Sequence, residues 1–101
     1  MELLVADNPD EARYEVFADG EPAGFVTYRL GSGRISFLHT EVDPAFEGHG
    51  VGGRLASEAL DDARARGLDV LPFCPFVKAY ITKHPEYLDL VPVDERDNFG
   101  L

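Results

Sequence analysis

Residues able to move a proton or attack a carbonyl carbon lie in two short segments of the chain. His39 and Glu41 are two positions apart, so in a strand their side chains share one face. Either could act as a general base, directly or through a water. Cys74 comes before Pro75, a residue suited to the first helical position, which predicts that Cys74 caps a helix and has an activated thiol. Such a thiol could act as a nucleophile.

Each of these residues also has a structural interpretation. Glu41 would then be a solvated carboxylate at a strand end, and His39 a hydrogen-bonded strand residue. Cys74 would be a small buried apolar side chain. The residues alone leave both interpretations open.

A run of glycines precedes the most regular amphipathic segment. Glycines occupy four of the six positions from 48 to 53, and the run Leu55–Arg66 follows directly. Glycine loses more backbone freedom on folding than other residues, so such a cluster indicates a backbone that must approach a ligand closely. A helix N-terminus offers unpaired N–H groups and partial positive charge, which suit an anion. The pattern predicts a phosphate-bearing ligand held by the main chain of His49 to Arg54.

Two other phosphate loops fit these glycines less well. Gly48, Gly50 and Gly53 satisfy the spacing of the dinucleotide fingerprint, but residues 43–47 separate them from the preceding strand. The nucleoside triphosphate loop ends in Gly-Lys-Ser/Thr, whereas residues 53–55 are Gly-Arg-Leu and lack the hydroxyl that holds magnesium. A glycine-rich turn that serves only helix packing remains an alternative.

Size and charge limit the classes of function. With 101 residues, 45% of them hydrophobic and 28% charged, the chain is predicted to fold as one domain spanning residues 1–101. The formal net charge of −10 argues against DNA or RNA as a partner, because neutralising phosphates requires clustered Lys and Arg. The same charge attracts cations, so we expect a cationic amine as a partner and no nucleic acid.

Cysteine content and hydropathy predict a cytoplasmic protein. Cys74 is the only cysteine, which excludes an intrachain disulfide and a multi-cysteine metal site, and no metal is predicted. Residues 1–7 have no cationic flank and no sustained apolar run, so no signal peptide is expected. No segment approaches the ~18 apolar residues needed to span a membrane, and no membrane partner is predicted.

Hydrophobic periodicity predicts an α+β fold with a mixed, mostly antiparallel sheet and two main helices. Alternating or β-branched segments predict strands at 3–6, 13–17, 25–30 and 34–42. Apolar residues four apart from Val51 to Ala63 predict a helix of about four turns that stops at Gly67.

The second half of the chain adds a crossover. A strand at 68–71 would lie parallel to the strand at 34–42 through a right-handed βαβ connection. A shorter helix is predicted from Pro75 to Lys83, because Pro85 follows it. The tail from Glu86 is predicted to form a short final strand or a packed segment.

Two segments taken together resemble the GCN5-related N-acetyltransferases, the GNAT superfamily. The first is His39-Thr40-Glu41-Val42-Asp43-Pro44-x-Phe46-Glu47-Gly48-x-Gly50-Val51-Gly52, and the second is Pro72-x-Cys74-Pro75-Phe76-Val77-x-x-Tyr80-Ile81-x-x-His84-Pro85-Glu86-Tyr87. Glu47-x-x-Gly50-Val51-Gly52 is similar to the family's pyrophosphate loop, with Glu47 where Gln or Arg is usual. The resemblance covers nearly the whole chain. It is strongest to the very small YjdJ-type members, which keep the cofactor-binding core and lack the helices that larger relatives place after the first strand.

This resemblance implies a minimal, acetyl-CoA-dependent N-acetyltransferase domain. Its acceptor would be a primary amine on a small molecule, a lysine or an N-terminus. The protein would act as a monomer or homodimer. Glu47 and the missing helices support an alternative, a non-catalytic acyl-CoA-binding module or sensor. Amine-dependent release of CoA would separate the two.

The resemblance also implies where acetyl-CoA binds. Pantetheine would lie in a slot where strands 34–42 and 68–71 diverge, and pyrophosphate would bind the glycine loop. Arg54, Lys78 or Lys83 would neutralise the remaining phosphate. The implied cofactor-binding residues are Leu38, Thr40, Val42, Glu47, Gly48, His49, Gly50, Val51, Gly52, Gly53, Arg54, Cys74 and Lys78.

Acyl transfer needs a base for the amine and a proton for the leaving thiolate. Tyr80 occupies the position from which many family members protonate that thiolate, and it could alternatively be a core aromatic. The candidate catalytic residues are Glu41, Cys74, Tyr80 and His39. Whether transfer is direct or passes through Cys74 stays open.

Overall fold

The first half of the chain forms an antiparallel meander in the computed structural model, which describes residues 1–101. The strands are β1 (Leu3–Asn8), β2 (Arg13–Ala18), β3 (Glu21–Gly31) and β4 (Arg34–Val42). Each pairs antiparallel with the next. Both tight turns between strands contain residues with positive φ, such as Asp19 and Gly20, as hairpin turns require. The predicted strands are confirmed, and β3 is longer at both ends than its apolar run.

A crossover helix links β4 to the last strand. Helix α1 spans Val51–Ala65 and ends before Gly67, whose φ is +68°, which confirms the predicted stop. Strand β5 (Asp69–Pro72) then pairs parallel with β4 from Arg34 to Phe37. The sheet order is β1-β2-β3-β4-β5, so the predicted mixed and mostly antiparallel sheet is confirmed.

The end of the chain is helical. Helix α2 spans Pro75–Lys83, as predicted, and two 3-10 helices follow, η3 (Pro85–Leu90) and η4 (Val93–Phe99). Two more 3-10 helices, η1 (Pro9–Glu11) and η2 (Pro44–Phe46), flank the meander. The tail forms no final strand; Tyr87, Val91 and Phe99 are buried, so it is the packed segment of the two expected alternatives.

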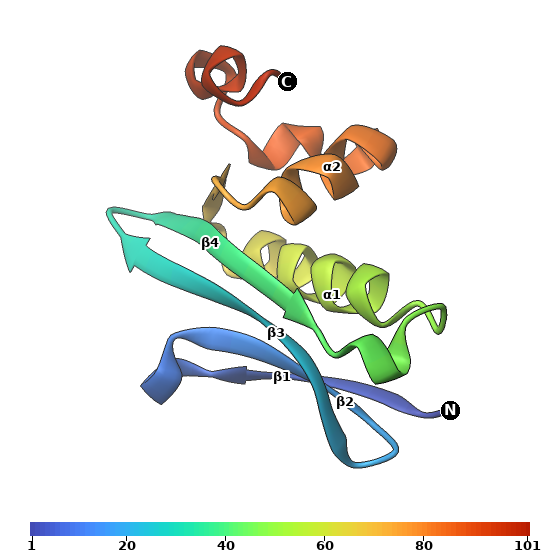
Figure 1. Ribbon diagram of the computed structural model, residues 1–101. Helices are drawn as coiled ribbons and strands as arrows, with labels where there is room; N and C mark the ends of the chain where they lie inside the picture. The colour runs from blue at the N-terminus through green and yellow to red at the C-terminus, as the bar shows by residue number, and fades with distance from the viewer.

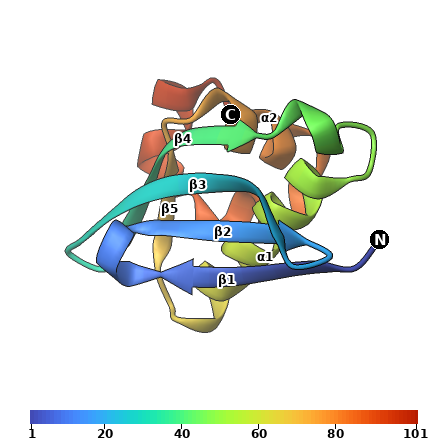
Figure 2. The same ribbon diagram turned by 60° about the horizontal axis from the view of Figure 1, so that its bottom comes forward.

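The two α-helices pack on the same face of the sheet. Figure 1 shows α1 and α2 beside β3 and β4, and Figure 2 shows β1 to β3 in front of α1, with α2 next to β4. Side chains from this face and from both helices form one buried cluster that includes Val16, Phe37, Leu55 and Ile81. Along β2 buried residues alternate with partly exposed ones. The opposite face of β1, β2 and β3 therefore has no helix over it.

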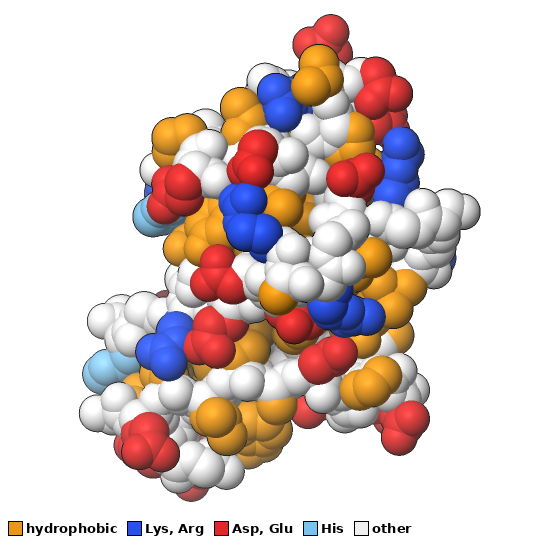
Figure 3. Space-filling view, turned by 180° about the vertical axis from the view of Figure 1, so that it is seen from behind, with side chains coloured by type: hydrophobic (Ala, Val, Ile, Leu, Met, Phe, Trp, Pro, Cys, Tyr) orange, Lys and Arg blue, Asp and Glu red, His pale blue; other side chains and the backbone are white.

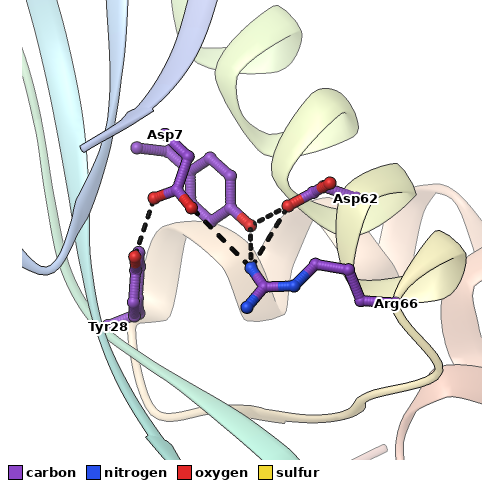
Figure 4. A network of polar contacts seen from close by, with 5 residues as sticks. Asp7, Tyr28, Asp62 and Arg66 are labelled. Atoms are coloured by element: carbon purple, nitrogen blue, oxygen red, sulfur yellow. Dashed lines mark hydrogen bonds and ion pairs between the residues drawn. The ribbon is translucent and has the colours of Figure 1, made fainter. Parts of the chain in front are cut away.

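A polar cluster joins the sheet to the C-terminal half of α1 (Figure 4). The Tyr14 hydroxyl donates to Asp62, the Tyr28 hydroxyl donates to Asp7 over 2.7 Å, and Arg66 lies 3.4 Å from Asp62 and 3.7 Å from Asp7. Burial, and then the hydrogen bond to Asp7, raise the pKa of Tyr28 to about 12. Burial and Asp62 likewise raise the pKa of Tyr14. This cluster keeps both phenols neutral.

The surface seen from behind mixes charges of both signs with apolar side chains (Figure 3). Lys and Arg side chains lie next to Asp and Glu rather than forming one basic patch there. No helix in the structure has both the length and the apolar character to cross a membrane.

Candidate functional site

The parallel strands β4 and β5 separate halfway along β4. Their pairing ends at Phe37 and Pro72, where the backbone N–H of Cys74 donates to the carbonyl of Phe37 over 2.9 Å. Next to this point the register with β3 shifts, because Thr27 pairs with His39 and Tyr28 with Phe37, leaving Leu38 as an extra residue. Such a bulge bends a strand. From Leu38 to Val42, β4 has no strand beside its outer edge, so backbone groups there are free to bind a ligand.

The glycine loop brings a helix N-terminus to the end of this free edge. Gly48 has φ +85° and Gly50 has φ +73°, conformations in which other residues are strained, and Gly50 caps α1. No side chain caps α1, so the N–H groups of Val51 to Gly53 lack partners within the helix. They border a hollow of about 320 Å³ lined by Val42, Phe46, Glu47, Gly48, Gly50, Val51, Gly52, Gly53 and Phe76.

Two aromatic side chains of α2 pack against the first turn of α1. A Cβ added at Gly52 would lie 2.6 Å from Cζ of Phe76, and one at Gly53 would lie 3.9 Å from the ring of Tyr80. Gly52 is therefore needed for the close approach of Phe76. Phe76 was not predicted as a site residue, although its spacing of four from Tyr80 places both on one helix face.

Cys74 faces the helix side of β4. It is the N-cap of α2, as predicted, yet its thiol makes no hydrogen bond to the helix. Its Sγ instead lies 2.9 Å from Oγ1 of Thr40, and the residue is only 2% exposed. Thr40 was predicted as part of the strand edge, and its hydroxyl contact with the thiol was missed. The contact ties α2 to β4 just beyond the point where the two strands separate.

His39 and Glu41 lie on the other face of β4. Nε2 of His39 is 3.3 Å from Oε2 of Glu41, and both side chains are 62% exposed. The ring of His39 is next to Phe25, with ring centroids 6.3 Å apart. Successive side chains alternate between faces of a strand, so Thr40 separates this pair from the Cys74 side. The two groups of candidate catalytic residues thus flank the same stretch of β4 from opposite faces.

The remaining candidate residues lie around the two helices. Tyr80 stacks on His84, with ring centroids 4.1 Å apart, beside the first turn of α1. Arg54 forms an ion pair with Glu58 one turn along α1. His49, Lys78 and Lys83 are exposed.

This arrangement suits a ligand with an anionic group and an extended amide-bearing arm. The free N–H groups of α1 and its partial positive charge fit a phosphate, whereas the only charged side chain in the hollow is the carboxylate of Glu47. The free edge of β4 fits peptide-like amides, because an exposed strand pairs readily with an extended chain. Phe46 and Phe76 give the hollow apolar walls between these two polar regions.

Comparison with known proteins agrees with this geometry. A sequence profile of the family described as GCN5-related N-acetyl-transferase matches residues 13–90. The chain is similar to the solution structure of a GCN5-like protein from Staphylococcus aureus, with a TM-score of 0.68 and 24% identity over 88% of this chain and 87% of that one, a likeness that shows the fold. It is also similar to Ard1 from Thermoplasma volcanium, with a TM-score of 0.52 and 25% identity over 58% of this chain and 40% of Ard1. No match was found among curated proteins. Because the profile covers most of the chain, the protein belongs to the GCN5-related N-acetyltransferase family and is an acyltransferase.

Proposed function

We propose that this acyltransferase uses acetyl-CoA and transfers its acetyl group to a primary amine. The observation that carries the proposal is the position of the unpaired N–H groups of Val51 to Gly53 beside the free edge of β4. Both features suit parts of one molecule, a pyrophosphate and an amide-bearing pantetheine arm. Acetyl-CoA would supply an acetyl group activated as a thioester.

Binding is assigned to three groups of residues. The loop from Glu47 to Arg54 would hold the pyrophosphate through its main chain. Leu38, Thr40 and Val42 would hold the arm along β4. Lys78, which forms no ion pair in the structure, would be available for a further phosphate, whereas Arg54 must first leave Glu58.

For the chemistry we propose direct transfer with His39 as the base. Glu41, 3.3 Å from His39, would orient the imidazole. The amine nitrogen would bond to the carbonyl carbon, its proton would pass to His39, and the departing thiolate would take a proton, for which Tyr80 is the candidate donor. Cys74 and Thr40 would line the acyl end of the slot from the other face.

The partners and surroundings follow from charge and cysteine content. A net charge of −10 favours a cationic acceptor over an anionic one. The single cysteine has no disulfide partner and fits the reducing cytoplasm. We propose that residues 1–101 act as one minimal domain.

The test is release of free CoA from acetyl-CoA across a panel of primary amines. The proposed transfer predicts that CoA release depends on the amine and falls when His39 is replaced by Gln. The control is Glu11→Gln, an exposed residue of η1 outside both hollows. Saturable acetyl-CoA binding with no release for any amine would instead indicate an acyl-CoA-binding module.

A further inference from the structure

A second hollow, of about 360 Å³, lies on the uncovered face of the sheet. It is bounded by β2, the start of β3 and the end of β4, and its walls include Arg13, Glu15, Phe17, Pro22, Phe25 and Glu41. Phe17 and Pro22 are apolar, and Asp43 adds a further carboxylate at the end of β4. The hollow is distinct from the one at the glycine loop, but Glu41 belongs both to it and to the His39 pair.

Strand register arranges this hollow as an aromatic ring between two carboxylates. Glu15 pairs with Phe25, and Phe25 pairs with Glu41, so the three form one row across β2, β3 and β4. Neighbouring strands are about 4.8 Å apart, which separates the two acidic positions by about 10 Å. A ring face and a carboxylate together attract organic cations. The row therefore places one apolar surface between two negative charges.

The chain's own Arg13 demonstrates this preference. Its guanidinium carbon lies 4.8 Å from the centroid of the Phe25 ring, and its Nε lies 2.7 Å from Oε2 of Glu15. With Arg13 paired to Glu15, the carboxylates of Glu41 and Asp43 leave an excess of negative charge in the hollow. A cationic ligand is favoured there over a neutral or anionic one.

We infer that this hollow binds the acceptor, and that the acceptor is a primary amine carrying a second cationic group on an apolar arm. The inference rests on the proposed function. The reacting amine would lie at His39, between the hollow and the free edge of β4 that begins at Leu38. The arm would run along Phe25 and Phe17, and the second cation would lie in the field of Asp43.

A matched pair of amines tests the inference. Cadaverine and pentylamine share a five-carbon arm and differ only in the second amino group. Free CoA release is measured with each amine for the wild type, for Asp43→Asn, and for the control Glu11→Gln. Both variants change the net charge equally, but Glu11 is exposed in η1 outside the hollow. Calorimetric binding of acetyl-CoA and thermal unfolding are measured for all three.

The wild type should show a kcat/KM for cadaverine about tenfold above that for pentylamine, equivalent to about 1.4 kcal/mol. Asp43→Asn should remove most of this preference by raising the KM for cadaverine more than the KM for pentylamine, and Glu11→Gln should behave as wild type. Equal use of both amines, or a preference that survives Asp43→Asn, would overturn the inference while leaving the proposed function intact.

Direct binding of cadaverine, followed by NMR, separates the two proposals when no CoA is released. Cadaverine binding that weakens in Asp43→Asn would support the hollow as an amine site and count against the proposed transfer. Absence of cadaverine binding to the wild type would overturn the inference.

Discussion

Gly52 and Gly53 are neighbours in the first turn of α1, yet their surroundings differ. The space beside Gly52 is filled by the Phe76 ring, whereas a methyl group at Gly53 would meet Tyr80 at an ordinary contact distance of 3.9 Å. Phe76 also lines the hollow at the glycine loop. A single methyl group should therefore disturb the site at Gly52 and leave it intact at Gly53.

Gly52→Ala is predicted to weaken acetyl-CoA binding about tenfold, because the new Cβ displaces Phe76 from the hollow. Gly53→Ala is predicted to keep wild-type affinity and to raise stability by up to about 1 kcal/mol, since alanine is the better helix former. Calorimetry and thermal unfolding measure both effects. Equal affinities in the two variants would contradict the role given to Phe76.

Substitution of Cys74 distinguishes direct transfer from a route through an acylated thiol. Cys74→Ser retains a hydrogen-bonding group beside Thr40, so direct transfer predicts a rate within a few-fold of wild type. Steady-state CoA release with a saturating amine is the measurement. A loss of turnover by several orders of magnitude in a folded Cys74→Ser protein would instead identify the thiol as an acyl carrier.

At the scale of elements, the two ends of α1 have different tasks. Its N-terminus leaves backbone donors free, while its C-terminal half is tied to the sheet through Asp62 and Arg66. This second attachment fixes the angle at which α1 crosses β1, β2 and β3. It also makes stability depend on the protonation of buried phenols.

Stability is predicted to fall above pH 10. The pKa of Tyr28 is raised to about 12, compared with about 10 for an unfolded tyrosine. Between these values the unfolded chain binds fewer protons than the folded chain, so the free energy of unfolding decreases with pH. The contribution of Tyr28 is fully present below pH ~10 and is lost as pH rises through ~12.

Denaturant unfolding of the wild type and Tyr28→Phe from neutral to alkaline pH measures this loss. Tyr28→Phe should be less stable than wild type at neutral pH by about 1–2 kcal/mol, because Asp7 loses a hydrogen bond. Its stability should then fall less steeply with pH. Parallel curves for the two proteins would count against the raised pKa.

Strand and helix positions were predictable because their signals are local. Alternation along β2, the four-residue spacing of Val51 to Ala63 and the Pro75 start of α2 needed no knowledge of distant contacts. The face of β4 that the helices cover depends on how α1 packs against the sheet. The sequence therefore predicted His39 and Cys74 in one site and did not show that they lie on opposite faces of β4. The Phe76 contact and the 3-10 helices of the tail likewise depend on packing between distant segments.

At the scale of the whole molecule, the sheet is covered on one face only. Larger relatives are expected from the resemblance to place helices after their first strand, and here only η1 lies between β1 and β2. The uncovered face carries Glu15, Phe25 and Glu41, which leaves the proposed acceptor hollow open to solvent. Access of an acceptor to this hollow then depends more on the acceptor's charge than on its shape.

Salt is predicted to weaken the use of a dicationic acceptor. Raising ionic strength from about 0.01 M to about 0.15 M shortens the screening length from about 30 Å to about 8 Å. The kcat/KM for cadaverine should fall with salt more steeply than that for pentylamine, because the net charge of −10 attracts the second cation. Identical salt dependence for both amines would contradict the attraction of the second cation by the net charge.

The measurement that tests the central claim most directly is an NMR titration of the isotope-labelled protein with acetyl-CoA. The account predicts saturable changes in the backbone amides of residues 48–54 and 38–42, with Glu11 and the rest of η1 unaffected. NADH, which shares the pyrophosphate but lacks pantetheine, should leave residues 38–42 unchanged. A spectrum that stays unaltered at millimolar acetyl-CoA, or changes confined to other parts of the chain, would contradict the assignment of this site.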